Sequence, residues 1–281
     1  MSSSSLASSP ASSSASDPAA RPLIAIQSVA KTYPNGTEAI RSFSLDIPSS
    51  PQFLSLLGPS GCGKSTLLRM IAGLEVCSAG QIDWPTASYD GHARPMPEIG
   101  FVFQEATLMP WATVFDNVYL PLRLKGKRRG EVRDEVMDLL AQVNLQKFAK
   151  SYPRELSGGM KMRVSIARAL ITRPKVLLMD EPFAALDEIT RLRLNNDLLQ
   201  LWETQKLTVI FVTHSVYESA FLSDRIVVMA SHPGRLMADL SISAPYPRTE
   251  EYRISQVYND FCRQVSGWLH KAMLAGGGEE L

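Results

Sequence analysis

The chain has 281 residues, of which 45% are hydrophobic and 20% charged, so it can bury a sizeable core. Its 29 Lys and Arg residues nearly balance its 28 Asp and Glu residues, which excludes a strongly basic nucleic-acid-binding protein, and we expect no nucleic acid partner. No apolar run approaches the roughly 18 residues of a membrane-spanning helix, and three widely spaced cysteines fit a reducing compartment, so we expect an intracellular protein that does not itself cross a membrane.

Residues 1–22 form a tail that begins with a Ser/Ala-rich stretch. Such a composition cannot offset the entropy lost on ordering, so we expect this tail to be disordered. It has neither the basic start nor the apolar block of a signal peptide. From residue 23, "LIAIQSV" and "IRSFSLDI" alternate apolar and polar residues, which predicts half-exposed antiparallel strands.

The next segment predicts a strand, a glycine loop and a helix in direct succession. The strand "QFLSLLG" runs into "GPSGCGKST", which matches the pattern G-x-x-x-x-G-K-[ST], and "KSTLLRMIAGL" predicts a helix that ends near Gly73. Backbone amides of such a loop point at phosphate oxygens, Lys64 supplies a cation for the β and γ phosphates, and Ser65 can bind Mg²⁺. A glycine-rich turn with an exposed lysine is the alternative. The nucleotide-binding residues predicted here are Gly58, Pro59, Ser60, Gly61, Cys62, Gly63, Lys64, Ser65 and Thr66.

Residues 105–160 predict a helical insert. "VFDNVYLPLRL" and "EVRDEVMDLLAQVNL" have helical periodicity and are separated by "KGKRRG". This basic segment is short and lacks interleaved aromatic residues, which favours a solvated turn over a nucleic-acid site. The apolar segment "ATLMPWATVFDNV" is either part of the core or an exposed docking surface.

Two further motifs carry chemistry. In "LSGGMKMRVSIARAL", Ser157 can cap a helix, and Gly158 and Gly159 leave its first amides open to an anion, so we expect a second phosphate site; a simple helix cap is the alternative. The apolar strand "VLLMDE" ends in two carboxylates, of which Asp180 can reach Mg²⁺, directly or through water, and Glu181 can act as a general base; a solvated acidic turn is the alternative.

Continuous apolar strands alternate with helices in the second half of the chain. A helix from Met160 to about residue 172, the strand "KVLLMD", another helix and the strand "LTVIFVTH" follow one another, which predicts a buried parallel sheet. The residues after "IVVMASHPGR" show a mixed pattern that predicts no extra domain, and we expect the last few to be frayed.

The order of these motifs resembles the ATP-binding domain of ABC proteins, whose signature is commonly LSGGQ. The resemblance covers residues 24–235 and implies an α/β fold: a P-loop NTPase core of the ABC ATPase type with a parallel sheet, an antiparallel β subdomain and a helical subdomain at about 105–160. On this basis we divide the chain into a tail (1–22), an ABC ATPase domain (23–235) and a C-terminal extension (236–281).

The resemblance also implies roles for four further residues. Tyr33 matches the aromatic residue that stacks on adenine, and Gln104 matches the glutamine that contacts Mg²⁺ and the attacking water. Asp187 matches the loop that joins the paired sites, and His214 matches the histidine that contacts the γ phosphate. Met160 replaces the usual glutamine, and its thioether cannot make that amide's hydrogen bonds, but we expect activity because the preceding Ser-Gly-Gly is present.

As cofactors the resemblance implies ATP and Mg²⁺, and as partners a second copy in a head-to-tail dimer, transmembrane permease subunits and, indirectly, a solute-binding protein. It places the chain peripherally on the cytoplasmic face of the inner (cell) membrane. "DEPFAALDEITR" and "FQEATLMPW" resemble the importer branch for nitrate, sulfonates and taurine. A soluble ABC ATPase acting outside transport would be expected to carry two such domains or a coiled-coil arm, and a P-loop kinase gives no reason for "LSGGM".

Overall fold

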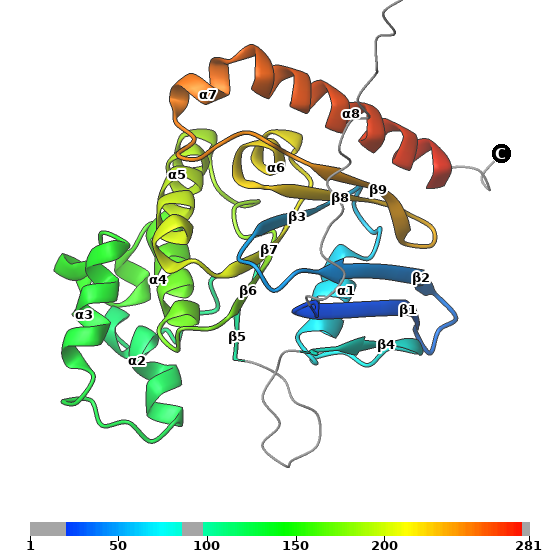
Figure 1. Ribbon diagram of the computed structural model, residues 1–281. Helices are drawn as coiled ribbons and strands as arrows, with labels where there is room; N and C mark the ends of the chain where they lie inside the picture. The colour runs from blue at the N-terminus through cyan, green and yellow to red at the C-terminus, as the bar shows by residue number, and fades with distance from the viewer. Residues whose placement is uncertain (1–20, 86–97, 277–281) are drawn as a thin grey trace, which may run out of the picture.

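The computed structural model describes residues 21–85 and 98–276, so the predicted disordered tail and the predicted frayed end lie almost wholly outside the described residues. Two sheets organise the protein (Figure 1). A three-stranded antiparallel sheet has the order β2-β1-β4, with bounds Glu38–Ile47, Ile24–Thr32 and Ala79–Asp83. A six-stranded sheet has the order β5-β6-β7-β3-β8-β9, with bounds Ile99–Val102, Val176–Asp180, Thr208–Thr213, Phe53–Leu57, Arg225–Ala230 and Arg235–Ser241.

The central strands of the six-stranded sheet are buried on both faces, as their continuous apolar sequences predicted. In β6, Val176 and Leu178 pack toward α1 and the three-stranded sheet, whereas Leu177 and Met179 pack toward the helical side. This division follows from the period of two along a strand. Five strands are parallel, and only β9 runs antiparallel to its neighbour β8. The predicted buried parallel sheet is therefore confirmed, with one antiparallel edge strand.

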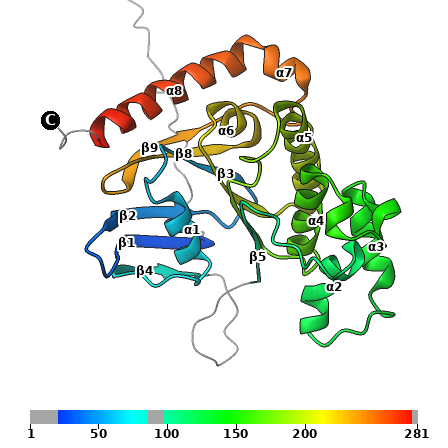
Figure 2. The same cartoon turned by 180° about the vertical axis from the view of Figure 1, so that it is seen from behind.

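Helices cover both faces of this sheet. The helix α1 (Lys64–Ile71) contacts β6 and β7 on one side and β2 on the other, so it lies between the two sheets. The opposite face is covered by a helical layer at the far end of the molecule from the three-stranded sheet, as Figures 1 and 2 show. Its helices are α2 (Val114–Leu124), α3 (Arg133–Gln142), α4 (Gly158–Leu170) and α5 (Glu188–Gln205), with 3-10 turns at Gln146–Phe148 and Pro153–Glu155. The helix α6 (Val216–Leu222) covers the same face nearer the centre of the molecule, against β3 and β7.

The C-terminal residues differ from the expectation of a mixed segment. A short helix α7 (Glu250–Ile254) leads into α8 (Gln256–Gly276), a 21-residue helix that lies against β8 and α6. One face of α8 buries Tyr258, Cys262 and Val265. The predicted domain boundary after residue 235 falls one residue into β9, so the C-terminal extension continues the same sheet and then covers it.

Within the described ranges, no helix has both the length and the apolar character required to span a membrane.

Candidate functional site

The glycine loop after β3 wraps around the amino group of Lys64. Gly63 has a φ of 88°, and a Cβ there would lie 2.8 Å from the carbonyl oxygen of Ala39, so only glycine fits. The Lys64 side chain is 4% exposed, and its Nζ donates hydrogen bonds of 3.0 Å to the carbonyl oxygens of both Gly58 and Pro59. The structure therefore holds a buried cation where the sequence predicts phosphate binding.

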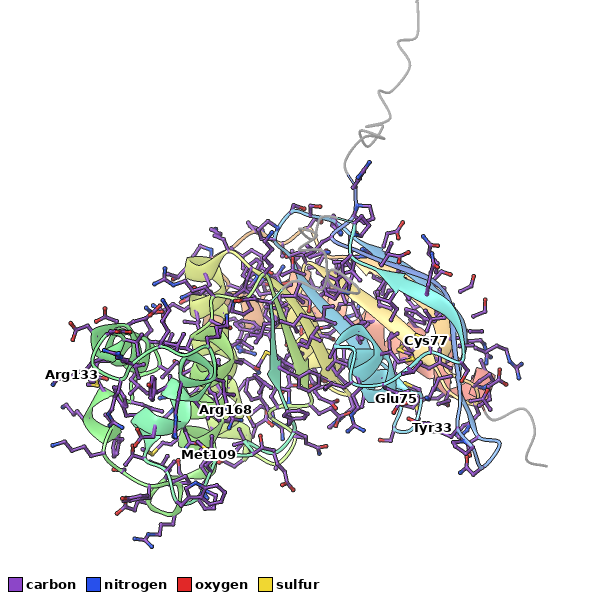
Figure 3. The ribbon with its side chains drawn as sticks, turned by 90° about the horizontal axis from the view of Figure 1, so that it is seen from below. Tyr33, Glu75, Cys77, Met109, Arg133 and Arg168 are labelled. Carbon is purple, nitrogen blue, oxygen red and sulfur yellow. The ribbon has the colours of Figure 1, made fainter. Side chains whose placement is uncertain are left out.

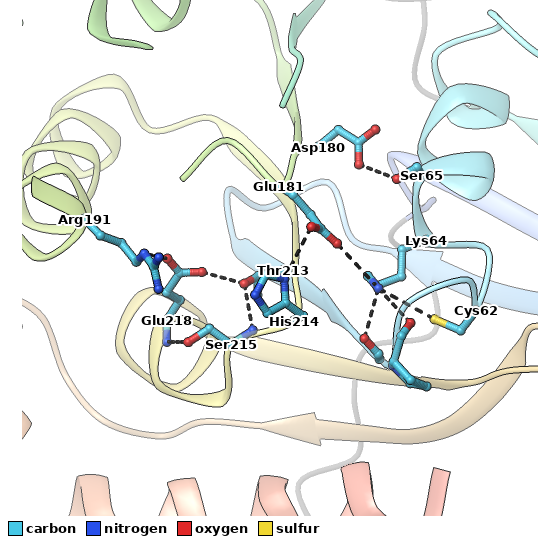
Figure 4. Close-up of polar contacts among 12 residues, drawn as sticks. Cys62, Lys64, Ser65, Asp180, Glu181, Arg191, Thr213, His214, Ser215 and Glu218 are labelled. Carbon is cyan, nitrogen blue, oxygen red and sulfur yellow. Dashed lines mark hydrogen bonds and ion pairs between the residues drawn. The ribbon is translucent and has the colours of Figure 1, made fainter. Parts of the chain in front are cut away.

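Ser65 and Asp180 are in direct contact next to this lysine (Figure 4). The Ser65 hydroxyl donates a hydrogen bond of 2.5 Å to the Asp180 carboxylate. Burial raises the pKa of Asp180, and the hydrogen bond from Ser65 opposes that shift. A hydroxyl and a carboxylate are hard oxygen donors of the kind that Mg²⁺ prefers, so this pair fits the predicted metal site.

Glu181 lies between Lys64 and His214. One carboxylate oxygen is 3.6 Å from Lys64 Nζ, and the other is 3.3 Å from His214 Nδ1. Glu181 has a φ of 44°, which turns the chain sharply after β6 and directs the side chain across the end of the sheet (Figure 4). A cation, a carboxylate and an imidazole therefore meet at one point.

Strand register explains why residues so far apart in sequence meet. Asp180 pairs with Val212 across β6 and β7, and Leu57 pairs with Thr213 across β3 and β7. Residues that follow these parallel strands must emerge at the same edge, the carboxyl edge of the sheet. Gln104 follows β5 by two residues at this edge and is exposed.

A pocket extends from the glycine loop toward Tyr33. The Tyr33 hydroxyl lies 3.3 Å from the Thr66 hydroxyl. The pocket volume is about 360 Å³, and its lining includes Ser60, Gly61, Gly63, Lys64, Ser65, Thr66, Glu181, Tyr33 and His232. Such a volume suits a small-molecule ligand. The predicted adenine-stacking residue and the predicted phosphate loop therefore line the same pocket.

His232 was not predicted. It belongs to the turn between β8 and β9, and Gly234 in the same turn exchanges backbone hydrogen bonds with Ala39 and Arg41. These bonds fasten the turn to β2 and thereby place His232 on the pocket wall.

The second predicted phosphate site lies apart from this pocket. Ser157 caps α4, because its hydroxyl accepts a hydrogen bond of 3.3 Å from the Met160 amide. A Cβ at Gly159 would lie 2.7 Å from the methyl carbon of Thr190, so this turn packs directly on the start of α5. Asp187 caps α5 and accepts a 2.9 Å bond from the Thr190 amide. Hydrogen bonding by the Thr190 side chain, and then by this amide, lowers the pKa of Asp187. The structure therefore brings Gly159, and with it Ser157 and Gly158, beside Asp187, and none of the four lines the pocket around Lys64.

The apolar segment after Gln104 lines a surface groove. Trp111 is 76% exposed there. Arg168 on α4 fixes the loop by donating hydrogen bonds to the carbonyl oxygens of Ala106 and Thr107, and Figure 3 shows Arg168 beside Met109. We call this the Trp111 groove; its lining includes Met109, Trp111, Asp116, Tyr119, Leu120, Arg123 and Arg129.

Comparisons with known proteins agree with this geometry. A family profile described as "ABC transporter" matches residues 40–184. The aliphatic sulfonates import ATP-binding protein SsuB of Bacillus cereus is 44% identical over 234 residues, which are 81% of this chain and 89% of the relative. A putative ATP-binding protein of Brucella abortus is 43% identical over 84% of this chain and 88% of its own.

Two solved structures are also similar. A dimeric ATP-binding cassette in a post-hydrolysis state, bound to ADP and phosphate, matches with a TM-score of 0.68 and 31% identity over 79% of this chain and 100% of its own. The cbiO1 protein of Clostridium perfringens, part of the ABC transporter complex cbiONQ, matches with a TM-score of 0.70 and 24% identity over 89% of this chain and 98% of its own. At that identity the second match supports the fold alone.

Proposed function

The chain belongs to the ABC transporter family of ATP-binding proteins, and we propose that it is the ATP-hydrolysing subunit that powers import of a small solute of the sulfonate, taurine or nitrate type through a separate membrane permease. The observation that carries this proposal is the 44% identity to an aliphatic sulfonates import protein over 81% of the chain. The convergence of Lys64, Asp180 and Glu181 at one edge of the sheet supplies the chemistry.

ATP binding follows from the pocket. Tyr33 stacks on the adenine ring, and the glycine loop directs its amides at the phosphates. Lys64 exchanges the two carbonyl oxygens that it contacts for the more strongly charged β and γ phosphate oxygens. Ser65 and Asp180, with Gln104 at the same edge, hold Mg²⁺, which when bound neutralises phosphate charge.

Hydrolysis follows from the groups around Glu181. This carboxylate accepts a proton from the attacking water as general base, and Lys64 and His214 stabilise negative charge on the transferring phosphoryl group. His214 is 54% exposed, so it is accessible to a γ phosphate from the solvent side.

The second phosphate site is completed by another copy of the chain. Ser157, Gly158 and Gly159 lie at the start of α4 and do not line the pocket of their own chain, so in a head-to-tail dimer the amides of this helix start face the nucleotide of the partner. Asp187 lies beside them and joins the two sites. The similarity to a cassette solved as a dimer supports this arrangement.

Coupling to transport uses the Trp111 groove. An exposed tryptophan flanked by Met109 and Leu120 is the kind of apolar surface that receives a partner helix, and the partner here is the permease. The chain then sits on the cytoplasmic face of the cell membrane, and the solute-binding protein acts on it only through the permease. None of these steps uses a nucleic acid.

The decisive test is Glu181→Gln. Loss of a general base lowers kcat by about 100-fold or more, while the amide keeps the size of the side chain and leaves ATP binding intact. Phosphate release and ATP binding are measured on the same preparation. Glu135→Gln is the matched control, because Glu135 lies on the surface of α3, away from the Lys64 pocket, and forms an ion pair with Arg173. Turnover of Glu181→Gln near that of the wild type would contradict the role of Glu181.

The cargo is tested separately. The chain is co-expressed with its permease and reconstituted into vesicles, and ATP hydrolysis is measured with solute-binding proteins loaded with a sulfonate, taurine or nitrate. Stimulation by one loaded binding protein identifies the solute, and hydrolysis that no binding protein changes would contradict the importer assignment.

A further inference from the structure

A row of polar side chains next to His214 connects α5 to α6 (Figure 4). The hydroxyl of Thr213 donates a hydrogen bond of 2.5 Å to the Glu218 carboxylate and accepts one of 3.0 Å from the amide of Ser215. The other carboxylate oxygen of Glu218 lies 3.9 Å from Nε of Arg191. We call these residues the Arg191–Glu218–Thr213 chain.

One end of this chain holds the loop that carries Asp187. Arg191 lies one turn into α5, and its Nη2 donates a hydrogen bond of 2.9 Å to the carbonyl oxygen of Leu186, the residue before Asp187. The guanidinium group therefore contacts the Asp187 loop and Glu218 at the same time. A planar fork of donors makes such a double contact, which the single ammonium of a lysine cannot reproduce.

The other end holds the loop that carries His214. Thr213 and Ser215 flank this histidine, and both are tied to α6, because the Glu218 amide also donates to the Ser215 hydroxyl at 3.3 Å. The backbone is thus fixed on either side of His214, whose side chain reaches Glu181.

The Arg191–Glu218–Thr213 chain is largely buried, and stability alone does not explain why charged and polar side chains lie there. Glu218 is 7% exposed and Thr213 is 2% exposed. Burial raises the pKa of the Glu218 carboxyl, and the contacts with Thr213 and Arg191 oppose that shift. A buried ion pair is often no more stabilising than well-packed apolar residues, and Nε of Arg191, which faces Glu218 at 3.9 Å, is buried without a hydrogen bond among the described residues. Such a costly contact is more readily explained by a role in fixing one geometry.

We propose that Arg191, Glu218 and Thr213 are positioning residues that fix the His214 loop relative to the Asp187 loop. The inference rests on the proposed function, in which His214 contacts the γ phosphate and Asp187 meets the second copy. Displacement of the Asp187 loop by the partner then moves Arg191, and through Glu218 it moves His214. The Arg191–Glu218–Thr213 chain thereby affects the rate of hydrolysis, although none of its three residues contacts the nucleotide.

The first test compares Thr213→Val with Thr213→Ser. Valine keeps the shape of the side chain and suits a strand but removes the hydroxyl, whereas serine keeps the hydroxyl. We expect Thr213→Val to lower kcat about tenfold with the KM for ATP within about twofold of wild type, and Thr213→Ser to retain kcat within about twofold. Equal kcat values for the two variants, or a KM that rises as kcat falls, would overturn the proposal.

The wild type and Glu181→Gln are assayed beside these variants. If the wild type hydrolyses ATP and Glu181→Gln does not, the ATPase assignment stands whatever the Thr213 variants do. Failure of the positioning role and failure of the ATPase assignment are thus distinguished.

The second test is a double-mutant cycle of Arg191→Gln and Glu218→Gln. Because both residues act through one chain, we expect each single variant to lose kcat about tenfold and the double variant to lose no more. Arg193→Gln, which removes an exposed arginine from the same helix, is the matched control and keeps wild-type kcat. Losses that multiply in the double variant would overturn the proposal. Thermal unfolding is measured for each protein, and where a glutamine variant does not fold, the Thr213 pair decides the question.

Discussion

Two regions of this protein use the same physical device, a glycine-containing turn at the start of a helix. At the start of α1, Lys64 and Ser65 are already in contact with Glu181 and Asp180 from the neighbouring strand. At the start of α4, Ser157 accepts hydrogen bonds only from amides of its own helix, those of Met160 and Lys161, among the hydrogen bonds of the described residues. A helix N-terminus attracts anions in both places, but only the first is surrounded by reacting groups. The difference indicates that the second site needs groups supplied from outside the chain.

The largest expected effect separates the two regions directly. Lys64→Ala removes the buried cation, and we expect the Kd for ATP to rise about 100-fold, because truncating one partner of a buried charge contact costs about 2–5 kcal/mol. Binding is measured by titration calorimetry on the single chain. Lys147→Ala, at an exposed lysine in a 3-10 turn, is the control. Unchanged ATP affinity in Lys64→Ala would remove the distinction between the two helix starts.

A smaller effect is expected at the other helix start. Ser157→Arg blocks the amides of α4, and we expect hydrolysis to fall about tenfold while the Kd for ATP of the isolated chain stays within about twofold. When this variant is mixed with Lys64→Ala, a mixed dimer holds one intact site, made of Lys64 from the Ser157→Arg copy and Ser157 from the Lys64→Ala copy, so activity rises above the average of the two variants alone. Ser243→Arg, at an exposed position outside both sites, is the control. If the mixture of Ser157→Arg and Lys64→Ala has only the average activity of the two variants, the site is not shared.

The third prediction concerns stability rather than activity, at the contact between Gly159 and Thr190. Gly159→Ala places a Cβ 2.7 Å from the Thr190 methyl carbon, so we expect a loss of about 1–3 kcal/mol in the free energy of unfolding. The second substitution Thr190→Ser removes that methyl group and restores stability. Gly267→Ala, in an exposed position of α8 where a Cβ meets nothing within 4 Å, instead gains about 0.5–1 kcal/mol. Denaturant unfolding measures all four proteins, and a stable Gly159→Ala single variant would contradict the close packing.

Much of the fold was readable from local pattern. The apolar run of β6 and the alternation in β1 predicted their burial, and the helices α2 and α3 followed from period. The strand β4 was not predicted because four of its five residues are exposed, so its sequence carries no periodic signal. The helix α8 did carry a signal, since Tyr258, Cys262 and Val265 lie at helical spacing, but the segment was interpreted as mixed.

The site divides in the same way. Lys64, Asp180 and Glu181 lie in motifs short enough to read, and the structure brings them together as that reading required. Arg191 ends the segment "DEPFAALDEITR" and His232 lies in "IVVMASHPGR", but no role was predicted for either residue. Their positions depend on contacts made after the chain folds: Arg191 on the Leu186 carbonyl, and His232 on a turn bonded to β2. No spacing or motif in the sequence predicts tertiary contacts of this kind.

The contact at Gly159 also has a consequence for how the sequence can vary. The turn that carries Ser157 and the loop that carries Asp187 meet with no space for one more methyl group. A larger residue at 159 therefore requires a smaller one at 190, and neither position can change first without loss. Among relatives of this protein, we therefore expect the residues at positions 159 and 190 to covary. Such covariation would reflect the close packing of two loops that together form one surface toward a partner molecule.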